Sequence, residues 1–184
     1  MAEAQQKAAA LTLPLKIFFQ DEARFGRISE PQDCWAMEGF RPDVPSQIIR
    51  EYTYAYGAVC PQDGAACYLI LPAMNGACMN LFLQELSARY ANHFLLVVYD
   101  GAPCHSPGVL DIPANMMVVK LPPQSPNLNP TENNWDDMRE KFFHNLVFNS
   151  MKALTKQLIT ACNHYETNPN IIQSITGWEW ILNY

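Results

Sequence analysis

The chain has 184 residues and a formal net charge of −6, with 49% hydrophobic and 16% charged residues. This composition excludes a disordered tail, and the length fits one domain around one core. The excess of acidic residues argues against a domain that grips nucleic acid by charge alone. No apolar run is long enough to span a membrane, and Pro14 and Lys16 interrupt the one run that resembles a signal peptide.

The six cysteines are scattered, without a C-x-x-C pair. This spacing argues against a structural zinc site. We therefore expect reduced thiols, serving as small core residues, in a cytoplasmic protein.

The N-terminal part is expected to consist of a leader followed by a strand. Residues 1–13 are rich in Ala and Gln and predict a flexible leader, so that the folded domain covers residues 14–184. Leu15 to Gln20 is apolar on both faces, as in a central strand that ends at Asp21.

Residues 23–47 hold glycines and prolines around Trp35 and predict a long excursion. A short strand is expected within it at residues 34–37. Trp35 is interpreted as a packing residue rather than a contact for DNA.

The middle of the chain predicts a hairpin, a helix and two strands. Residues 47–71 are two strand-like runs joined by the turn sequence Pro61-Gln62-Asp63-Gly64. An amphipathic helix should follow and run to about Tyr90. Apolar strands are then expected at residues 94–99, ending at Asp100, and at residues 116–121.

The C-terminal third predicts helices. Asn129 is a good N-cap and Pro130 suits the first helical position of a helix to about His144. Ser150 should cap another helix, and the apolar tail 171–184 should pack on the domain or on a partner. The order of elements indicates an α/β layer arrangement with a mixed sheet.

Three acids stand out: Asp21 and Asp100 each follow a strand-like run, and Glu132 falls in the first turn of a helix. Each has an ordinary explanation, since Asp100-Gly101 is a turn sequence and Glu132 could bond back to the N–H of Asn129 as a capping box. Together, however, they supply the oxygen ligands that Mg²⁺ requires.

The motifs around these acids resemble those of one family. They are Phe-Gln-Asp21-Glu-Ala-Arg-Phe, Trp35 with Gly39, Tyr-Asp100-Gly-Ala-Pro-Cys-His105, and the run from Leu121 to Trp135. The set resembles the catalytic domain of mariner-superfamily DDE transposases, most of all the bacterial insertion-sequence 630 type.

The resemblance implies an RNase H-like (retroviral integrase-like) fold, with a mixed central β-sheet flanked by helices. It implies Asp21, Asp100 and Glu132 as the catalytic triad, which binds two Mg²⁺ or Mn²⁺ ions. The activity implied is cleavage of DNA at transposon ends and transfer of the freed 3′-hydroxyl into a TA target.

Neighbouring residues are candidates for supporting roles. Glu22 is interpreted as a supporting or structural acid, and Asp136 as either an exposed helix acid or a member of the site. His105 either contacts the scissile phosphate or bonds locally. Arg24, Arg27 and Lys120 are candidate phosphate contacts, against the alternative of ordinary surface charge.

The partners that the resemblance implies are DNA and a second copy of the chain in a homodimer, without a membrane, and with association to the nucleoid when DNA is bound. Members of the family carry helix-turn-helix domains before the first acid, whereas twenty residues precede Asp21. We therefore expect end recognition to need another polypeptide or a longer fused product. Two alternatives stay open: a catalytically silent interaction domain, and another RNase H-like nuclease such as a resolvase.

Overall fold

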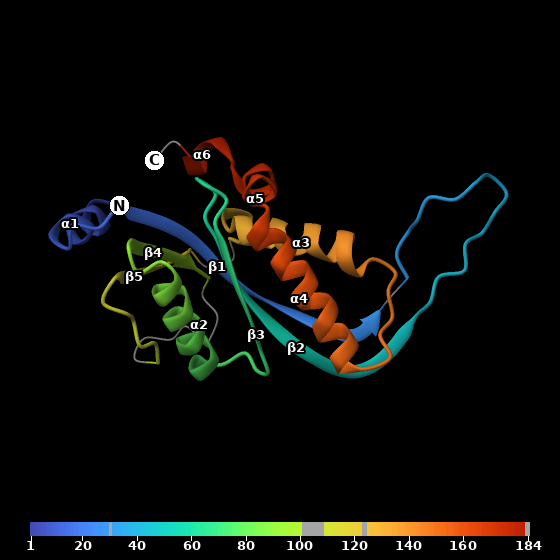
Figure 1. Cartoon of the computed structure of the whole chain (residues 1–184). Coiled ribbons are helices and arrows are strands. Elements are labelled where there is room, and N and C mark those ends of the chain that lie inside the picture. Colours follow the sequence, from blue (N-terminus) through green and yellow to red (C-terminus); the bar gives the residue numbers. More distant parts are fainter. Residues whose placement is uncertain (30, 101–108, 123–124, 183–184) are drawn as a thin grey trace.

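A five-stranded mixed sheet in the order β3-β2-β1-β4-β5 forms the centre of the protein (Figure 1). It is seen in a computed structural model that describes residues 1–29, 31–100, 109–122 and 125–182. The strands are β1 (Leu15–Ser29), β2 (Gln47–Val59), β3 (Ala66–Leu71), β4 (Phe94–Tyr99) and β5 (Met116–Lys120).

Strand β1 is the longest strand and has different neighbours along its length. Its first part pairs in parallel with β4, from Leu15 opposite Phe94 to Phe19 opposite Val98. From Phe19 onward it pairs antiparallel with β2. The expected end at Asp21 was therefore wrong: the strand continues to Ser29, because β2 supplies hydrogen-bond partners after β4 has ended.

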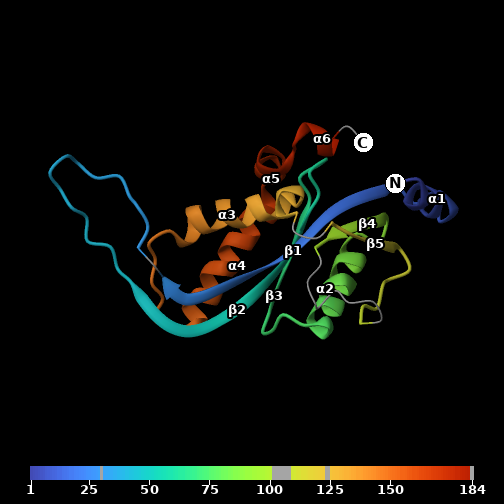
Figure 2. The same ribbon diagram turned by 180° about the vertical axis from the view of Figure 1, so that it is seen from behind.

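The helices lie on both faces of this sheet, as Figures 1 and 2 show from opposite sides. Side chains of α2 share a core with one face, while those of α3 and α4 share a core with the other. In the described part of the chain, no helix is long and apolar enough to cross a membrane. The helices are α1 (Ala2–Ala10), α2 (Gly76–Arg89), the 3₁₀ turn η2 (Pro126–Leu128), α3 (Pro130–Phe143), α4 (Met151–Thr167), α5 (Pro169–Thr176) and α6 (Glu179–Leu182).

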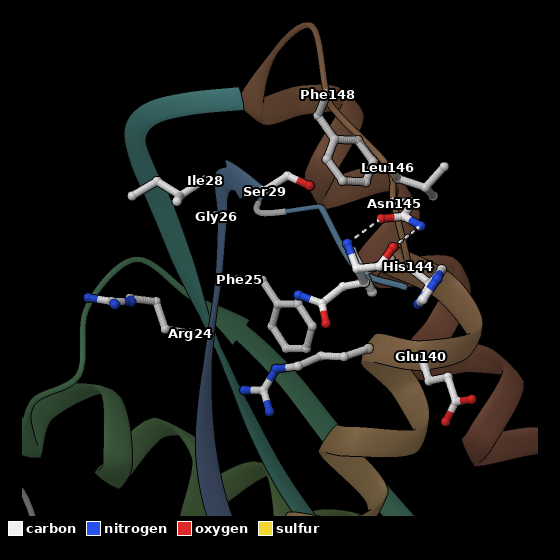
Figure 3. A pocket seen from close by; sticks show the side chains of 13 residues that line it. Arg24, Phe25, Gly26, Ile28, Ser29, Glu140, His144, Asn145, Leu146 and Phe148 are labelled. Carbon is white, nitrogen blue, oxygen red and sulfur yellow. Dashed lines mark hydrogen bonds between the residues drawn. The ribbon is translucent and has the colours of Figure 1, made fainter. Parts of the chain in front are cut away.

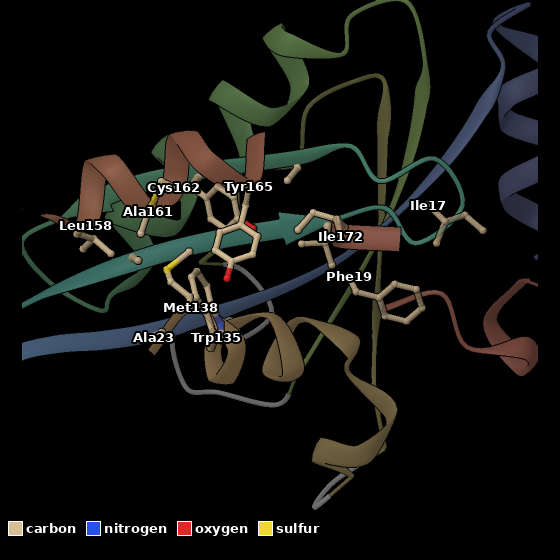
Figure 4. Packing of buried hydrophobic residues seen from close by; sticks show 14 of the residues in the cluster. Ile17, Phe19, Ala23, Trp135, Met138, Leu158, Ala161, Cys162, Tyr165 and Ile172 are labelled. Atoms are coloured by element: carbon tan, nitrogen blue, oxygen red, sulfur yellow. The ribbon is translucent and has the colours of Figure 1, made fainter. Parts of the chain in front are cut away.

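The larger core lies between the sheet and the C-terminal helices (Figure 4). Phe19 and Ala23 of β1 contribute to it, together with Trp135 of α3 and Tyr165 of α4. Trp135 and Tyr165 are fully buried. This core fixes α3 against β1, which is the junction that matters for the site.

The two ends of the chain pack on the domain. Residues 1–13 were expected to lack structure, yet α1 forms there, because Ala is the best helix former, and Ala4 and Ala8 share one buried face. The division of the chain at residue 13 stays a prediction. The apolar tail packs as expected, since Ile172 and Ile181 are buried in the larger core.

Residues 31–46 form a long excursion between β1 and β2 (Figure 1). The expected strand at 34–37 is wrong, because these residues have no strand structure. Trp35 is 104% exposed, so its interpretation as a packing residue was wrong as well. Cys34 is also exposed, whereas Cys60, Cys67, Cys78 and Cys162 are buried free thiols, as expected.

The predicted hairpin turn at residues 61–64 and the helix ending near Tyr90 were both correct. So were the strand at 94–99 and the N-caps Asn129 and Ser150, and the strand expected at 116–121 forms but ends one residue earlier, at Lys120.

Candidate active site

Asp21 lies on β1, and Asp100 directly follows the end of the neighbouring parallel strand β4. The last residue of β1 with a partner on β4 is Phe19, which lies opposite Val98. Asp21 is two residues beyond Phe19, and Asp100 is two residues beyond Val98. Because side chains alternate along a strand, each acid follows the face of the residue two before it. Phe19 and Val98 both pack in the larger core, so this is the face that α3 covers.

Helix α3 begins at the position that the sequence predicts. Asn129 is its N-cap and accepts a hydrogen bond from the backbone N–H of Thr131 at 3.2 Å, with Pro130 next in the chain. Glu132 lies in the first turn. The capping-box alternative was wrong, because among the described residues no hydrogen bond joins the Glu132 carboxylate to the N–H of Asn129. The Asn129 side chain performs the capping instead.

Three hydrogen bonds join the start of α3 to three successive residues of β1. Thr131 Oγ1 donates to the carbonyl of Phe19 at 2.8 Å, and Asn129 Nδ2 donates to the carbonyl of Gln20 at 3.0 Å. Trp135 Nε1 donates to the Asp21 carboxylate oxygen Oδ2 at 3.0 Å. All three are buried, so the first two turns of α3 are fixed relative to β1 just where β4 ends.

The negative charge of Asp100 acts on both Asp21 and Glu132. Burial raises the pKa of Asp21 to about 8, with further contributions from the negative charges of Glu132, Glu22 and Asp100. Burial also raises the pKa of Glu132, where Asp136 and Asp100 add to the effect and Arg139 opposes it. An acid whose charge raises the pKa of a neighbouring acid lies close enough for the two charges to repel.

The donor set of this site fits a hard divalent cation. Carboxylate oxygens are the ligands of Mg²⁺ and Mn²⁺, and a cation would offset the repulsion among the acids. As the side chains stand, however, no three His, Cys, Asp or Glu residues within the described ranges are gathered closely enough to hold an ion. To share one, Asp100 and Glu132 must therefore turn toward Asp21, whose carboxylate Trp135 holds.

The supporting candidates lie at different distances from this site. Glu22 is half-buried on β1, and its charge acts on Asp21. Asp136 is an exposed helix acid, 3.3 Å from Arg139 and with 77% of its side chain accessible. Lys120 is exposed at the end of β5, opposite Tyr99. His105 lies outside the described residues.

The two candidate arginines of β1 differ in their contacts. Arg27 is held by the structure: its Nε donates to the carbonyl of Phe148 at 2.9 Å, and it forms an ion pair with Glu51 at 2.6 Å. Arg24 is exposed and lies 5.2 Å from the ring centre of Tyr52. Of these two arginines, only Arg24 has a guanidinium that a phosphate from solution can reach.

A pocket of about 400 Å³ lies between the distal half of β1 and the end of α3 (Figure 3). Arg24, Arg139 and His144 line it, and Glu140 is the acid among its lining residues. Arg139 lies seven residues beyond Glu132, which is about 10 Å along a helix. The pocket therefore places Arg139 a short distance from Glu132.

Two residues of this site were not singled out from the sequence. Trp135 follows Glu132 by three residues, so the spacing alone puts both on neighbouring parts of one helix surface. Its hydrogen bond to Asp21 could be predicted only if the docking of α3 on β1 were known. Gly57 lies opposite Asp21 on β2, and nothing near it in the sequence indicates that a ring lies against it.

Comparison with known proteins supports one family. The family model described as DDE superfamily endonuclease matches residues 16–155. The uncharacterized protein y4pE/y4sA of Sinorhizobium fredii is 34% identical over 131 residues, which cover 70% of this chain and 96% of that protein.

Solved structures share the fold at low sequence identity. The Mos1 mariner paired-end complex with Mn has a TM-score of 0.62 at 16% identity, over 88% of this chain and 54% of that chain. The Mos1 strand transfer complex has a TM-score of 0.61 at 16% identity, over 99% of this chain and 60% of that chain. The chain thus spans little more than half the length of these Mos1 chains.

The HTLV-2 integrase catalytic core, solved with magnesium, has a TM-score of 0.50 at 9% identity, over 85% of this chain and 86% of that chain. The mixed sheet flanked by helices is therefore an RNase H-like fold, as the resemblance implied. With a family model covering most of its length, the chain belongs to the DDE superfamily of endonucleases.

Proposed function

We propose that this chain is the catalytic domain of a transposase, which cuts DNA at transposon ends and joins the freed 3′-hydroxyl to a TA target. The observation that carries the proposal is the level placement of Asp21 and Asp100 beside the rigid start of α3, which bears Glu132. Membership of the DDE endonuclease family and the fold shared with Mos1 support it.

Asp21, Asp100 and Glu132 are the proposed catalytic and metal-binding residues. Two Mg²⁺ or Mn²⁺ ions, when bound, would lower the pKa of the attacking water or 3′-hydroxyl and stabilise the leaving oxygen. The protein's own contribution would be positioning: β1 and the residue after β4 would each supply one carboxylate, and the start of α3 the third. Because Asp21 is buried and of raised pKa, it must lose its proton when it becomes a ligand.

The DNA is expected to run along the face of α3. Arg24 and Arg139 would contact its phosphates near the acids, and Lys120 at the end of β5 is a further proposed contact. Glu22 and Asp136 would act through charge on the site rather than as ligands. His105, five residues after Asp100, stays a candidate contact of the scissile phosphate.

The remaining parts of the proposal concern the assembly. We propose the insertion-sequence 630 type, a homodimer as the active complex, and association with the nucleoid through DNA. Since the net charge is −6, affinity for transposon ends would come largely from a helix-turn-helix segment elsewhere, on the same or another polypeptide.

The test is Mn²⁺-dependent nicking of supercoiled plasmid DNA. Wild-type protein should convert the plasmid to its nicked form, and Asp100→Asn should reduce the rate at least about a hundredfold, because one ligand of the cation is lost. Glu179→Gln is the control: it removes an exposed acid of α6 that has no role in the proposed site, and it should keep the activity. Nicking that is unchanged in Asp100→Asn would contradict the assignment, and a folded wild type that never nicks DNA would favour a silent interaction domain.

A further inference from the structure

Trp135 contacts a proposed metal ligand directly. Its indole Nε1 donates to Asp21 Oδ2 at 3.0 Å, and the two residues are 0% and 6% exposed. A carboxylate without such a bond can rotate about its last side-chain torsion, whose energy well is broad. Fixing one oxygen therefore fixes where the other oxygen points.

The indole itself has little freedom to move. Tyr68 packs against it edge to face, with ring centres 5.6 Å apart, and Phe25 does the same at 6.1 Å. On a further side lies Gly57, where an added Cβ would come within 2.6 Å of two carbons of the indole. The N–H is thus held in one direction by packing on several sides.

Trp135 also belongs to the helix that carries Glu132. The two residues are three positions apart on α3, so they lie on neighbouring parts of its surface. The bond from Trp135 therefore relates Asp21 on β1 to Glu132 on α3 by one rigid element. Thr131 and Asn129 bond only to backbone carbonyls of β1, whereas Trp135 alone among these three holds the acid itself.

We propose that Trp135 is a positioning residue for the metal site: its indole N–H sets the orientation of the Asp21 carboxylate, so that this acid and Glu132 face the same cation. This inference rests on the proposed function of the three acids. Groups that orient ligands in this way contribute about 10- to 100-fold to metal affinity.

The experiment measures Mn²⁺ binding to metal-free protein by the loss of the free-ion EPR signal. Trp135→Phe keeps a ring in the core and removes the N–H, and it should weaken Mn²⁺ binding about tenfold or more. Tyr68→Phe is the matched control. It removes a buried hydrogen bond beside Trp135, from Tyr68 Oη to Asn134 Oδ1 at 2.5 Å, without touching Asp21, so Mn²⁺ affinity should stay within about twofold of wild type.

Circular dichroism establishes that each variant is folded. If Trp135→Phe does not fold, the sulfur isostere of tryptophan, placed at residue 135 alone, removes the N–H and keeps the shape. Equal Mn²⁺ affinity in wild type and in a folded variant without the N–H would overturn the inference, provided Asp21→Asn loses binding. An equal loss in Tyr68→Phe would also overturn it, since general loosening of the core would then explain the effect. Absence of Mn²⁺ binding by the wild type would instead overturn the proposed function.

Discussion

Gly57 and Trp135 lie so close together that one added carbon at residue 57 would collide with the indole. A Cβ there would be 2.6 Å from both Cη2 and Cζ2 of Trp135. Gly57 is also the register partner of Asp21 across β1 and β2. The same pair of strands therefore makes room for the indole and presents the carboxylate to which it donates.

The first prediction follows from this contact. Gly57→Ala should lower the free energy of unfolding by about 1–3 kcal/mol, because the ring is packed on several sides and cannot retreat without strain. Urea denaturation of the purified protein measures the change.

Trp135→Phe provides the control, since phenylalanine lacks the two indole carbons that the new methyl group would meet. The double variant should lose less stability than the sum of the two single variants, by about 0.5–3 kcal/mol. Strict additivity would mean that the contact is not the cause.

A second prediction concerns pH in the presence of a chelator. The pKa of Asp21 is raised from 3.8 to about 8 in the folded protein, so between these values the folded carboxyl keeps a proton that the unfolded chain releases. The free energy of unfolding should therefore fall as pH rises from about 4 to 8, by at most about 1.4 kcal/mol per pH unit from this group.

Asp21→Asn should flatten this dependence, because an amide does not ionise and its oxygen still accepts from Trp135. The variant should also be more stable than wild type at pH 8. Denaturation series across this pH range, for both proteins, give the slopes. Equal slopes would contradict the buried, proton-bound state of Asp21.

The fold could be predicted where one local pattern decides the structure. The doubly apolar run at Phe94 to Tyr99 and the cap at Asn129 are of this kind, and both elements form as expected. The second half of β1 could not be predicted, because Asp21, Glu22 and Arg24 interrupt its apolar pattern. That half is a strand because β2 pairs with it, and this pairing is a contact between distant residues.

The site divides in the same way. The sequence indicates Asp21 and Asp100 because each follows a strand-like apolar run, and Glu132 because it lies in the first turn of a predicted helix. It does not show the docking of α3 on β1. Trp135 is an ordinary apolar helix residue by spacing, and only tertiary contact gives its N–H a carboxylate partner. Arg27 shows the reverse: its charge suggests a phosphate contact, but Phe148 and Glu51 already occupy it.

A third prediction tests the basic edge of the pocket in Figure 3, by which we mean the two lining arginines Arg24 and Arg139. Arg24→Ala and Arg139→Ala should each weaken binding of double-stranded DNA at low salt. Each should also reduce the slope of log affinity against log salt by about 1, because one phosphate contact is lost. Fluorescence anisotropy over a series of salt concentrations measures both quantities.

Lys152→Ala is the matched control for these arginines. Lys152 is an exposed cation near the start of α4 and does not line the pocket. Its removal lowers the net charge by the same amount, but because Lys152 lies outside the pocket, the salt slope should stay close to that of wild type. An equal effect in all three variants would show that total charge, rather than this edge, determines the affinity.

The last prediction concerns stabilisation by divalent cations. Mn²⁺ should raise the melting temperature, because an ion bound among Asp21, Asp100 and Glu132 offsets the repulsion that adds to burial in raising the pKa of Asp21 and of Glu132. At an ion concentration a hundred times the dissociation constant, the gain in unfolding free energy is about 2.7 kcal/mol. Sodium chloride at the same ionic strength controls for screening and should give a much smaller shift.

Asp100→Asn should lose most of the Mn²⁺ effect while melting at or above the wild-type temperature in chelator, since it removes one of the repelling charges. A shift of equal size with sodium chloride would indicate screening of the acids rather than a bound ion.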